Sequence, residues 1–156
     1  MFSAREIIDI ALKIEQNGEA VYRQAVKNLD SPELSERLLW MADEEARHMD
    51  WFKKFQAELR DDGNRLAVDE MSSSALGDIL GDQSFTLQDI DFSQVTHISN
   101  LIDIFIEFER DGILFYELLR TFIKDPGSLD PLDQIIQEEY QHIEILRQLK
   151  TVPSPT

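Results

Sequence analysis

The two halves of this 156-residue chain repeat one another at a constant offset of 94 residues, and no gap is needed to align them. Most of the repeated positions are polar or glycine, and the residues able to bind or support metal among them form two sets. In the first set, Glu15, Gly18 and Tyr22 recur as Glu109, Gly112 and Tyr116. In the second set, Glu44, Glu45 and His48 recur as Glu138, Glu139 and His142. A duplication that keeps residues able to bind metal while most other positions differ predicts two equivalent halves that meet around a two-metal site.

Apolar residues recur with helical spacing in four segments, which predicts an all-α chain. The predicted helices are 3–29, 31–60, 96–123 and 130–150, the last beginning at Asp130-Pro131. Short links within each half predict two antiparallel hairpins, 3–60 and 96–150. Residues 61–95, with a short helix expected near 74–80, then form a long crossover that lets the second and third helices run parallel. The predicted fold is therefore an antiparallel four-helix bundle of two duplicated hairpins, with residues 1–151 as one domain and 152–156 as a tail.

Composition excludes several kinds of site and favours a soluble protein. The chain has no cysteine, so it has no disulfide, zinc–thiolate site, iron–sulfur cluster or thiol nucleophile. A formal charge of −16 repels nucleic acid and anionic lipid. The charged N-terminal segment resembles neither a signal peptide nor a membrane span, so we expect a cytoplasmic protein with no nucleic-acid or membrane partner.

Each predicted helix carries a glutamate in the middle of its apolar stripe, and two helices add a histidine three residues later. These candidate metal ligands are Glu15, Glu45, His48, Glu109, Glu139 and His142. Four buried carboxylates are untenable without compensating charge, because desolvation costs several kcal/mol per ion. Two divalent cations supply four positive charges. Glutamate and histidine three residues apart share a helical face, and oxygen with nitrogen donors favours iron or manganese.

Other repeated positions are predicted to support these ligands. Tyr22 and Tyr116 lie two turns beyond their glutamates on the same faces, where their hydroxyls are expected to bond to ligand carboxylates. Aromatic packing with a solvated hydroxyl is the alternative. Gly18 and Gly112 interrupt helix interiors, either to leave room for metals and a bound oxygen species or to allow close helix packing.

The remaining polar residues of these helices are predicted to lie outside the site. Glu44 and Glu138 point about 100° away from the ligand direction and are expected at the surface. Glu19 is expected at the edge of its stripe, with an extra carboxylate at the site as the alternative. His97 is expected to be exposed, and Trp40, Trp51 and the nine phenylalanines are expected to serve packing.

The segments IEQNGEAVY, DEEARH, FERDGILFY and QEEYQH resemble the four ligand segments of rubrerythrin-like proteins in the ferritin-like superfamily. The resemblance implies a ferritin-like bundle with a non-haem di-iron centre that reacts with hydrogen peroxide or dioxygen. It implies terminal ligands at Glu15 and Glu109 and bridging ligands at Glu45 and Glu139. The nitrogen ligands it implies are His48 and His142.

The chain also departs from that family. It lacks the cysteine-ligated rubredoxin site, so the resemblance implies an external electron donor such as a rubredoxin-like protein. Gly112 stands where rubrerythrins have a further glutamate, which puts their ligand switching in doubt. Only six residues follow Lys150, too few for the fifth helix of cage-forming ferritins. A 24-subunit iron store is therefore disfavoured. The assembly that the family resemblance by itself implies is a homodimer.

The sequence thus predicts a di-iron oxidoreductase that reduces hydrogen peroxide or dioxygen. An iron-binding or ferroxidase protein that captures or stores iron without peroxidase turnover is the first alternative, because no electron donor is built in. A di-manganese catalase, which needs no outside electrons, is the second. A helical interaction module with a vestigial site is disfavoured, because all six ligands are present.

Overall fold

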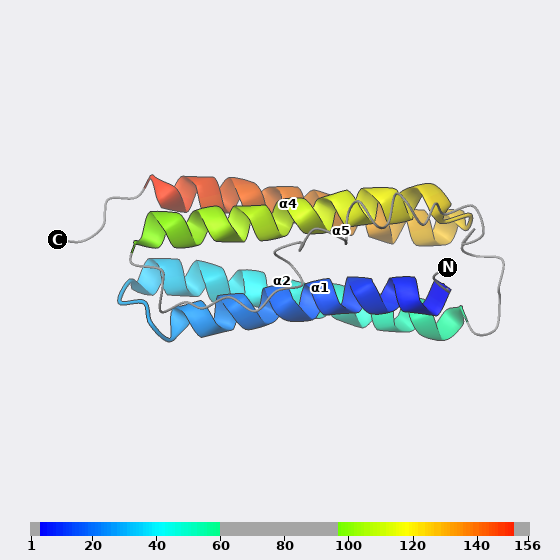
Figure 1. Cartoon of the computed structure of the whole chain (residues 1–156), viewed down its shortest axis with the longest axis horizontal. Helices are drawn as coiled ribbons and strands as arrows, with labels where there is room; N and C mark the ends of the chain where they lie inside the picture. Colours follow the sequence, from blue (N-terminus) through cyan, green and yellow to red (C-terminus); the bar gives the residue numbers. More distant parts are fainter. Residues whose placement is uncertain (1–3, 60–96, 152–156) are drawn as a thin grey trace.

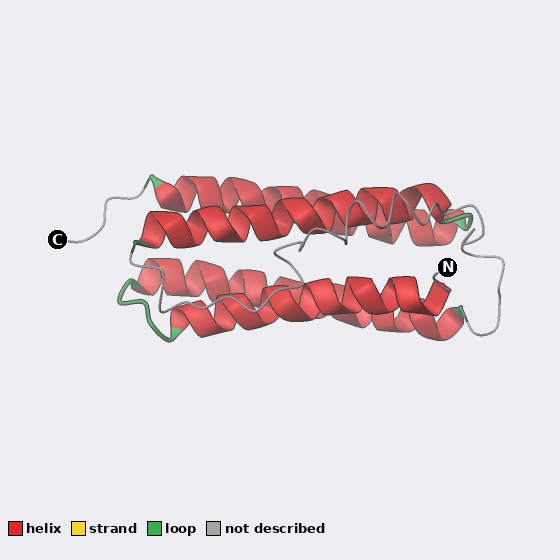
Figure 2. Cartoon of the chain, in the orientation of Figure 1, coloured by secondary structure: helices red, strands yellow, loops and turns green. Residues whose placement is uncertain are grey.

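A computed structural model describes residues 4–59 and 97–151 and confirms the all-α four-helix bundle (Figure 1). Its helices are α1 (Ala4–Val26), α2 (Pro32–Glu58), α4 (Ile98–Phe122) and α5 (Pro126–Lys150). Short loops join the two helices of each half (Figure 2). Helix α1 packs mainly on α2 and α4 mainly on α5, while α1 with α4 and α2 with α5 make fewer contacts. Each half is therefore a helical hairpin.

The two hairpins stack so that α2 and α4 run in the same direction along the bundle (Figure 1). The end of α2 and the start of α4 consequently lie at opposite ends of the molecule, as the predicted crossover topology requires. The crossover itself, the short helix expected near 74–80 and the tail 152–156 fall outside the described residues. No helix among the described residues is both long enough and apolar enough to cross a membrane.

The starts of the helices follow from local capping, and one predicted start was wrong. Ser31 caps α2, its Oγ accepting a hydrogen bond from the Leu34 N–H at 3.3 Å, as the Ser-Pro pair predicts. Helix α5 begins at Pro126 rather than at Asp130. Asp125 caps it by accepting from the Gly127 N–H at 3.2 Å and from the Ser128 hydroxyl at 2.9 Å. Pro131 is thus tolerated inside the helix near its start, where it removes one backbone hydrogen bond.

The apolar core consists of two clusters with polar residues between them. One contains Ile7, Ile8, Phe52, Phe115 and Leu132 among others. The other contains residues such as Ala25, Leu38, Met41, Phe105 and Leu146. Along α1, α2 and α5 the chain passes from one cluster to the other, and the predicted ligand residues lie at the crossing. The fold therefore places these polar groups in the middle of the bundle, with apolar packing on both sides.

Candidate metal centre

All six predicted ligand residues are buried, and none is more than 5% exposed. Helices α1 and α4 each supply one glutamate, while α2 and α5 each supply a glutamate and a histidine one turn later. Each helix turns its apolar stripe toward the bundle axis, so a polar residue within the stripe must enter the core. The four stripes converge, and the duplicated sets face each other across the bundle.

The structure brings the six side chains into two overlapping groups whose candidate ligand atoms lie within 4.8 Å of one another. The first group is Glu15, Glu45, His48 and Glu139. The second group is Glu45, Glu109, Glu139 and His142. Glu45 and Glu139 belong to both groups, so they occupy the positions that bridging carboxylates would take. Glu15 and Glu109 each belong to a single group, as terminal ligands would.

The two histidine rings are oriented alike: Nδ1 of each ring faces the carboxylates of the predicted ligands, and Nε2 faces Glu138 or Glu44 on the opposite side of the ring. His48 Nδ1 lies 2.9 Å from Glu139 Oε1, and His142 Nδ1 lies 3.1 Å from Glu45 Oε1. The rings stack across the centre with 6.3 Å between their centroids. Since Nδ1 faces the carboxylates in both halves, Nδ1 is the nitrogen positioned to bind a metal.

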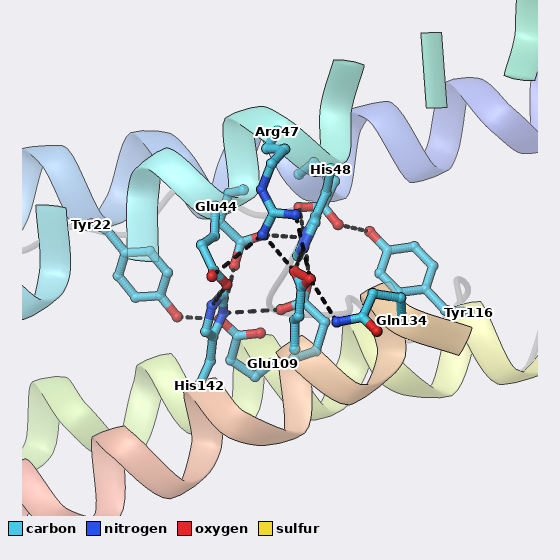
Figure 3. Close-up of polar contacts among 12 residues, drawn as sticks. Tyr22, Glu44, Arg47, His48, Glu109, Tyr116, Gln134 and His142 are labelled. Carbon is cyan, nitrogen blue, oxygen red and sulfur yellow. Dashed lines mark hydrogen bonds and ion pairs between the residues drawn. The ribbon is translucent and has the colours of Figure 1, made fainter. Parts of the chain in front are cut away.

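The prediction that Glu44 and Glu138 lie at the surface was wrong. His142 Nε2–H donates to Glu44 Oε2 at 2.8 Å, and His48 Nε2–H donates to Glu138 Oε2 at the same distance (Figure 3). Glu138 is buried, and the Glu44 side chain is only 14% exposed. A direction about 100° from the ligands on α2 points toward α5 rather than toward water, and the converse holds on α5. The recurrence of both residues at the 94-residue offset was the signal that could have identified them.

Two further residues near Glu138 were not singled out from the sequence. Arg47 Nη2 lies 2.7 Å from Glu138 Oε2, and Gln134 Nε2–H donates to Glu138 Oε1 at 3.1 Å. Glu44, His48 and Glu138 also have candidate ligand atoms within 4.8 Å of one another. The Arg47 guanidinium already lies against both of those carboxylates. We therefore assign these outer glutamates to orienting the histidines rather than to holding a third ion.

The two tyrosines link the halves crosswise. The Tyr22 hydroxyl on α1 donates to Glu109 Oε1 on α4, and the Tyr116 hydroxyl on α4 donates to Glu15 Oε1 on α1 at 2.5 Å (Figure 3). Burial and the neighbouring carboxylates raise the pKa of both phenols well above the usual value of 10. Both hydroxyls therefore keep their protons and fix one oxygen of each terminal glutamate.

The carboxylates differ in their affinity for protons. Burial and the negative charges of the other glutamates raise the pKa of Glu139 to about 8 and that of Glu45 well above its usual value. Burial also acts to raise the pKa of Glu109, but hydrogen bonds from neighbouring groups and the charge of His142 lower it to about 2. The pKa of Glu15 is likewise lowered against its burial, mainly by hydrogen bonds with Glu45 and His48. Without metal, the shared pair holds protons and the terminal pair is anionic.

The histidines complete the charge balance. Burial lowers their affinity for protons, but the adjacent carboxylates raise the pKa of His48 to about 11 and that of His142 well above its usual value. Two imidazolium ions then face the two anionic terminal glutamates, and the cluster of six is neutral. Two divalent cations with four ionised glutamates and neutral histidines give the same total. The site can therefore exchange protons for metal without accumulating buried charge.

The donors present fit two divalent cations. Glu15 Oε2 and Glu139 Oε2 are buried and accept no hydrogen bond among the described residues, although His48 Nδ1 lies 3.5 Å from the first and His142 Nδ1 lies 3.2 Å from the second. A buried carboxylate oxygen without a hydrogen bond is costly unless another partner binds it. All donors are carboxylate oxygens or imidazole nitrogens, which suit iron and manganese. Glu19, by contrast, pairs with Arg23 at 3.3 Å and belongs to neither group, in keeping with a place at the edge of the stripe.

A small cavity of about 10 Å³ borders the carboxylates, and Gly18, Gly112, Phe108 and both tyrosines help to line it. A cavity of this volume has room for about one water molecule. A Cβ atom at Gly18 would lie 3.4 Å from Glu45 Cδ, whereas one at Gly112 would lie 3.5 Å from Ile14 Cγ2. Gly18 thus leaves room for a carboxylate of the site, and Gly112 for packing of α1 against α4.

Two residues outside the cluster were predicted with different success. His97 is exposed, as predicted, and precedes the first residue of α4. Trp40 was expected to serve packing, yet it is 42% exposed. Its ring packs edge-to-face with that of His142, with 5.9 Å between the centroids. Because Trp40 lies on the face of α2 toward α5, it covers a ligand histidine from the solvent side rather than filling the core.

Comparisons with known proteins agree with this architecture. The sequence model of the rubrerythrin family matches residues 6–150. A crystal structure described as that of a ferritin-like diiron-carboxylate protein from Thermotoga maritima superposes with a TM-score of 0.68. The two sequences are 22% identical, and the superposition covers 96% of this chain and 95% of the other. No curated protein gives a significant match. The structural likeness confirms the ferritin-like fold.

Proposed function

The chain belongs to the rubrerythrin family, and on that premise we propose that it is a di-iron oxidoreductase that reduces hydrogen peroxide, or dioxygen, by two electrons. Glu15, Glu109 and the two histidines would each bind one iron, and Glu45 and Glu139 would bind both. The two orphaned oxygens, on Glu15 and Glu139, support this assignment. Manganese fits the same donors.

The observation that carries the proposal is the size and lining of the cavity beside the carboxylates. Its volume of about 10 Å³ admits a molecule close to the size of water and leaves no space for an organic substrate. It is bounded by tyrosine hydroxyls that hold protons and by carboxylates of both metal groups. A cavity of this size beside the carboxylates that both groups share suits a small oxidant.

The reduction of one hydrogen peroxide to two waters consumes two electrons and two protons. A pair of ferrous ions supplies the two electrons when bound. Tyr22 and Tyr116 hold Glu109 and Glu15 by one oxygen each, which leaves the other oxygen of each carboxylate available to a metal. Glu44 and Glu138 fix the histidine tautomer with the proton on Nε2, so that Nδ1 is free to bind. The apolar clusters on both sides exclude bulk water.

Repeated turnover requires electrons from outside the chain, because the sequence contains no cysteine to hold a second redox centre. We propose a small external donor such as a rubredoxin-like protein. The homodimer expected from the family resemblance stays a prediction.

The proposal is tested by loading the metal-free protein anaerobically with Fe²⁺, measuring the bound iron, and mixing rapidly with hydrogen peroxide or dioxygen. Two irons per chain, oxidised much faster by peroxide than by dioxygen, are expected. The double variant Glu45→Gln with Glu139→Gln should bind fewer irons. Glu144→Gln is the matched control, because its side chain on α5 is 62% exposed and far less constrained.

Two other outcomes would support the alternatives instead. Rapid oxidation by dioxygen with continued iron uptake would indicate iron capture or storage. Fast disproportionation of peroxide by the Mn²⁺-loaded protein, without a reductant, would indicate a di-manganese catalase. Binding of clearly fewer than two ions, unchanged in the double variant, would refute the metal centre.

A further inference from the structure

The duplication that creates the site is broken at two positions next to the histidines. Position 47 is arginine, whereas the equivalent position 141 is glutamine. Position 40 is tryptophan, whereas the equivalent position 134 is also glutamine. The six ligands and the two outer glutamates are symmetric in type, so these substitutions make the surroundings of the two histidines different.

Arg47 lies between the outer glutamates but binds one of them more closely. Its Nη2 lies 2.7 Å from Glu138 Oε2 and its Nη1 lies 3.4 Å from Glu138 Oε1. The same Nη2 lies 3.4 Å from Glu44 Oε1 (Figure 3). Gln134 adds an N–H donor to Glu138 at 3.1 Å. Glu138 is thus held by a guanidinium and an amide in addition to His48.

Glu44 has a different set of neighbours. It accepts from His142 Nε2–H at 2.8 Å, and its other oxygen has only the longer contact to Arg47 among the described contacts. The residue equivalent to Gln134 is Trp40, whose ring packs edge-to-face with His142 and donates no hydrogen bond to Glu44 in the described structure. The Glu44 carboxylate, which accepts from His142, therefore has fewer other hydrogen-bond donors than the Glu138 carboxylate, which accepts from His48.

This difference affects how strongly each imidazole binds a metal. A carboxylate that accepts from Nε2–H increases the basicity of Nδ1. A carboxylate that already accepts from a guanidinium and an amide polarises the ring less. The positive charge of Arg47 also lies nearer to the His48 side, although its side chain is 59% exposed and solvent screens that charge. Both effects make His142 the stronger donor.

We propose that the two metal ions are bound with unequal affinity, the ion beside His142 more tightly, and that Arg47 sets the difference as a positioning residue. The inference deepens the proposed function and rests on it, because it requires a two-metal site. Partners of ligand histidines typically change metal affinity by 10- to 100-fold. Because Arg47 is partly solvated, we expect a difference at the lower end, about tenfold.

The test uses Zn²⁺, which is redox-inert, and follows the ring nitrogens of ¹⁵N-labelled histidine by NMR during titration of the metal-free protein. The chain has three histidines, and exposed His97 serves as an internal control that should not respond. In the wild-type protein, His142 Nδ1 should shift during the first equivalent and His48 Nδ1 during the second. Simultaneous shifts of both histidines would overturn the inequality.

Two variants test the role of Arg47. Arg47→Gln places the residue of the other half at this position, and the two histidines should then respond closer together, with only the Gln134 contact to Glu138 still separating them. The double variant Arg47→Gln with Gln141→Arg transfers the guanidinium to the other half, and the order should reverse. Both positions are exposed, so folding should tolerate the changes. A separation between the two steps that is as large in Arg47→Gln as in the wild-type protein would refute the role of Arg47.

Failure of the inference is distinguishable from failure of the proposed function. Two ions bound with equal affinity would refute only the inequality. Fewer than two ions bound, with neither buried histidine responding, would refute the metal centre itself. If Arg47→Gln did not fold, Arg47→Lys would keep the charge but lose the paired contacts with Glu138, and its two steps should lie closer together than those of the wild-type protein.

Discussion

Binding of two divalent cations should expel about four protons from the protein at pH 7. In the metal-free site, Glu45 and Glu139 are protonated carboxyls, and His48 and His142 are imidazolium ions. Metal coordination requires ionised carboxylates and neutral imidazoles. Each of these four residues therefore loses one proton when the ions bind.

The pKa values set the pH dependence of this number. The pKa of Glu139 is about 8, so roughly nine-tenths of its carboxyl groups are protonated at pH 7 and roughly one-tenth at pH 9. The pKa of His48 is about 11, so its extra proton is still present at pH 9. The protons released by Glu139 and His48 together should therefore fall from about two at pH 7 to about one at pH 9, and the total should fall with them.

Isothermal titration calorimetry with Zn²⁺ in buffers of different ionisation enthalpy measures the number directly, from the slope of observed enthalpy against buffer enthalpy. Release of one proton or fewer by the wild-type protein at pH 7 would refute the proposed protonation of the metal-free site.

Three further predictions concern stability and access to the site. Tyr116→Phe removes the hydrogen bond to buried Glu15 Oε1 and should lower the free energy of unfolding of the metal-free protein by about 1–3 kcal/mol in urea titrations. Gly18→Ala places a methyl group beside the small cavity and Glu45, so Fe²⁺ stoichiometry should stay at two while stopped-flow oxidation by peroxide slows by about tenfold or more. Stability of the metal-free protein should fall from pH 5 to pH 9, because the pKa values of Glu139 and His48 are raised and the folded state binds more protons than the unfolded state across that range. A metal-free protein more stable in urea at pH 9 than at pH 5 would contradict that sign.

The helices and the convergence of the ligand residues were predictable from sequence for one physical reason. A glutamate in the middle of an apolar stripe must enter the core, and four such stripes in a bundle must meet. The start of α5 was not predicted correctly, because two Asp-Pro pairs, at Asp125 and Asp130, satisfy the same capping pattern. The hydrogen bonds of Asp125 with Gly127 and Ser128 decide between them, and they depend on the local backbone.

The outer residues of the site were not predictable in the same way. A helical wheel places Glu44 correctly relative to Glu45, but it does not show which helix lies beside that face. The contact of Arg47 with Glu138 joins residues 91 positions apart and depends on the register between α2 and α5. Nothing in the spacing of either helix fixes that register. The exposed position of Trp40 beside His142 depends on it too.

The charges of the site show why the single arginine matters. Duplication supplies ligands and outer glutamates in pairs, so every charged residue that is identical in both halves contributes its charge twice. The six ligand residues are balanced either by protons or by two divalent cations, but the two outer glutamates are not. Arg47 neutralises one of these two negative charges and lies closer to Glu138 than to Glu44. A chain with the same residue at positions 47 and 141 would carry either two arginines or none, so it could not place a single positive charge beside the outer glutamates. The departure from symmetry at position 47 therefore gives the two otherwise equivalent halves different electrostatic surroundings while leaving their ligands identical.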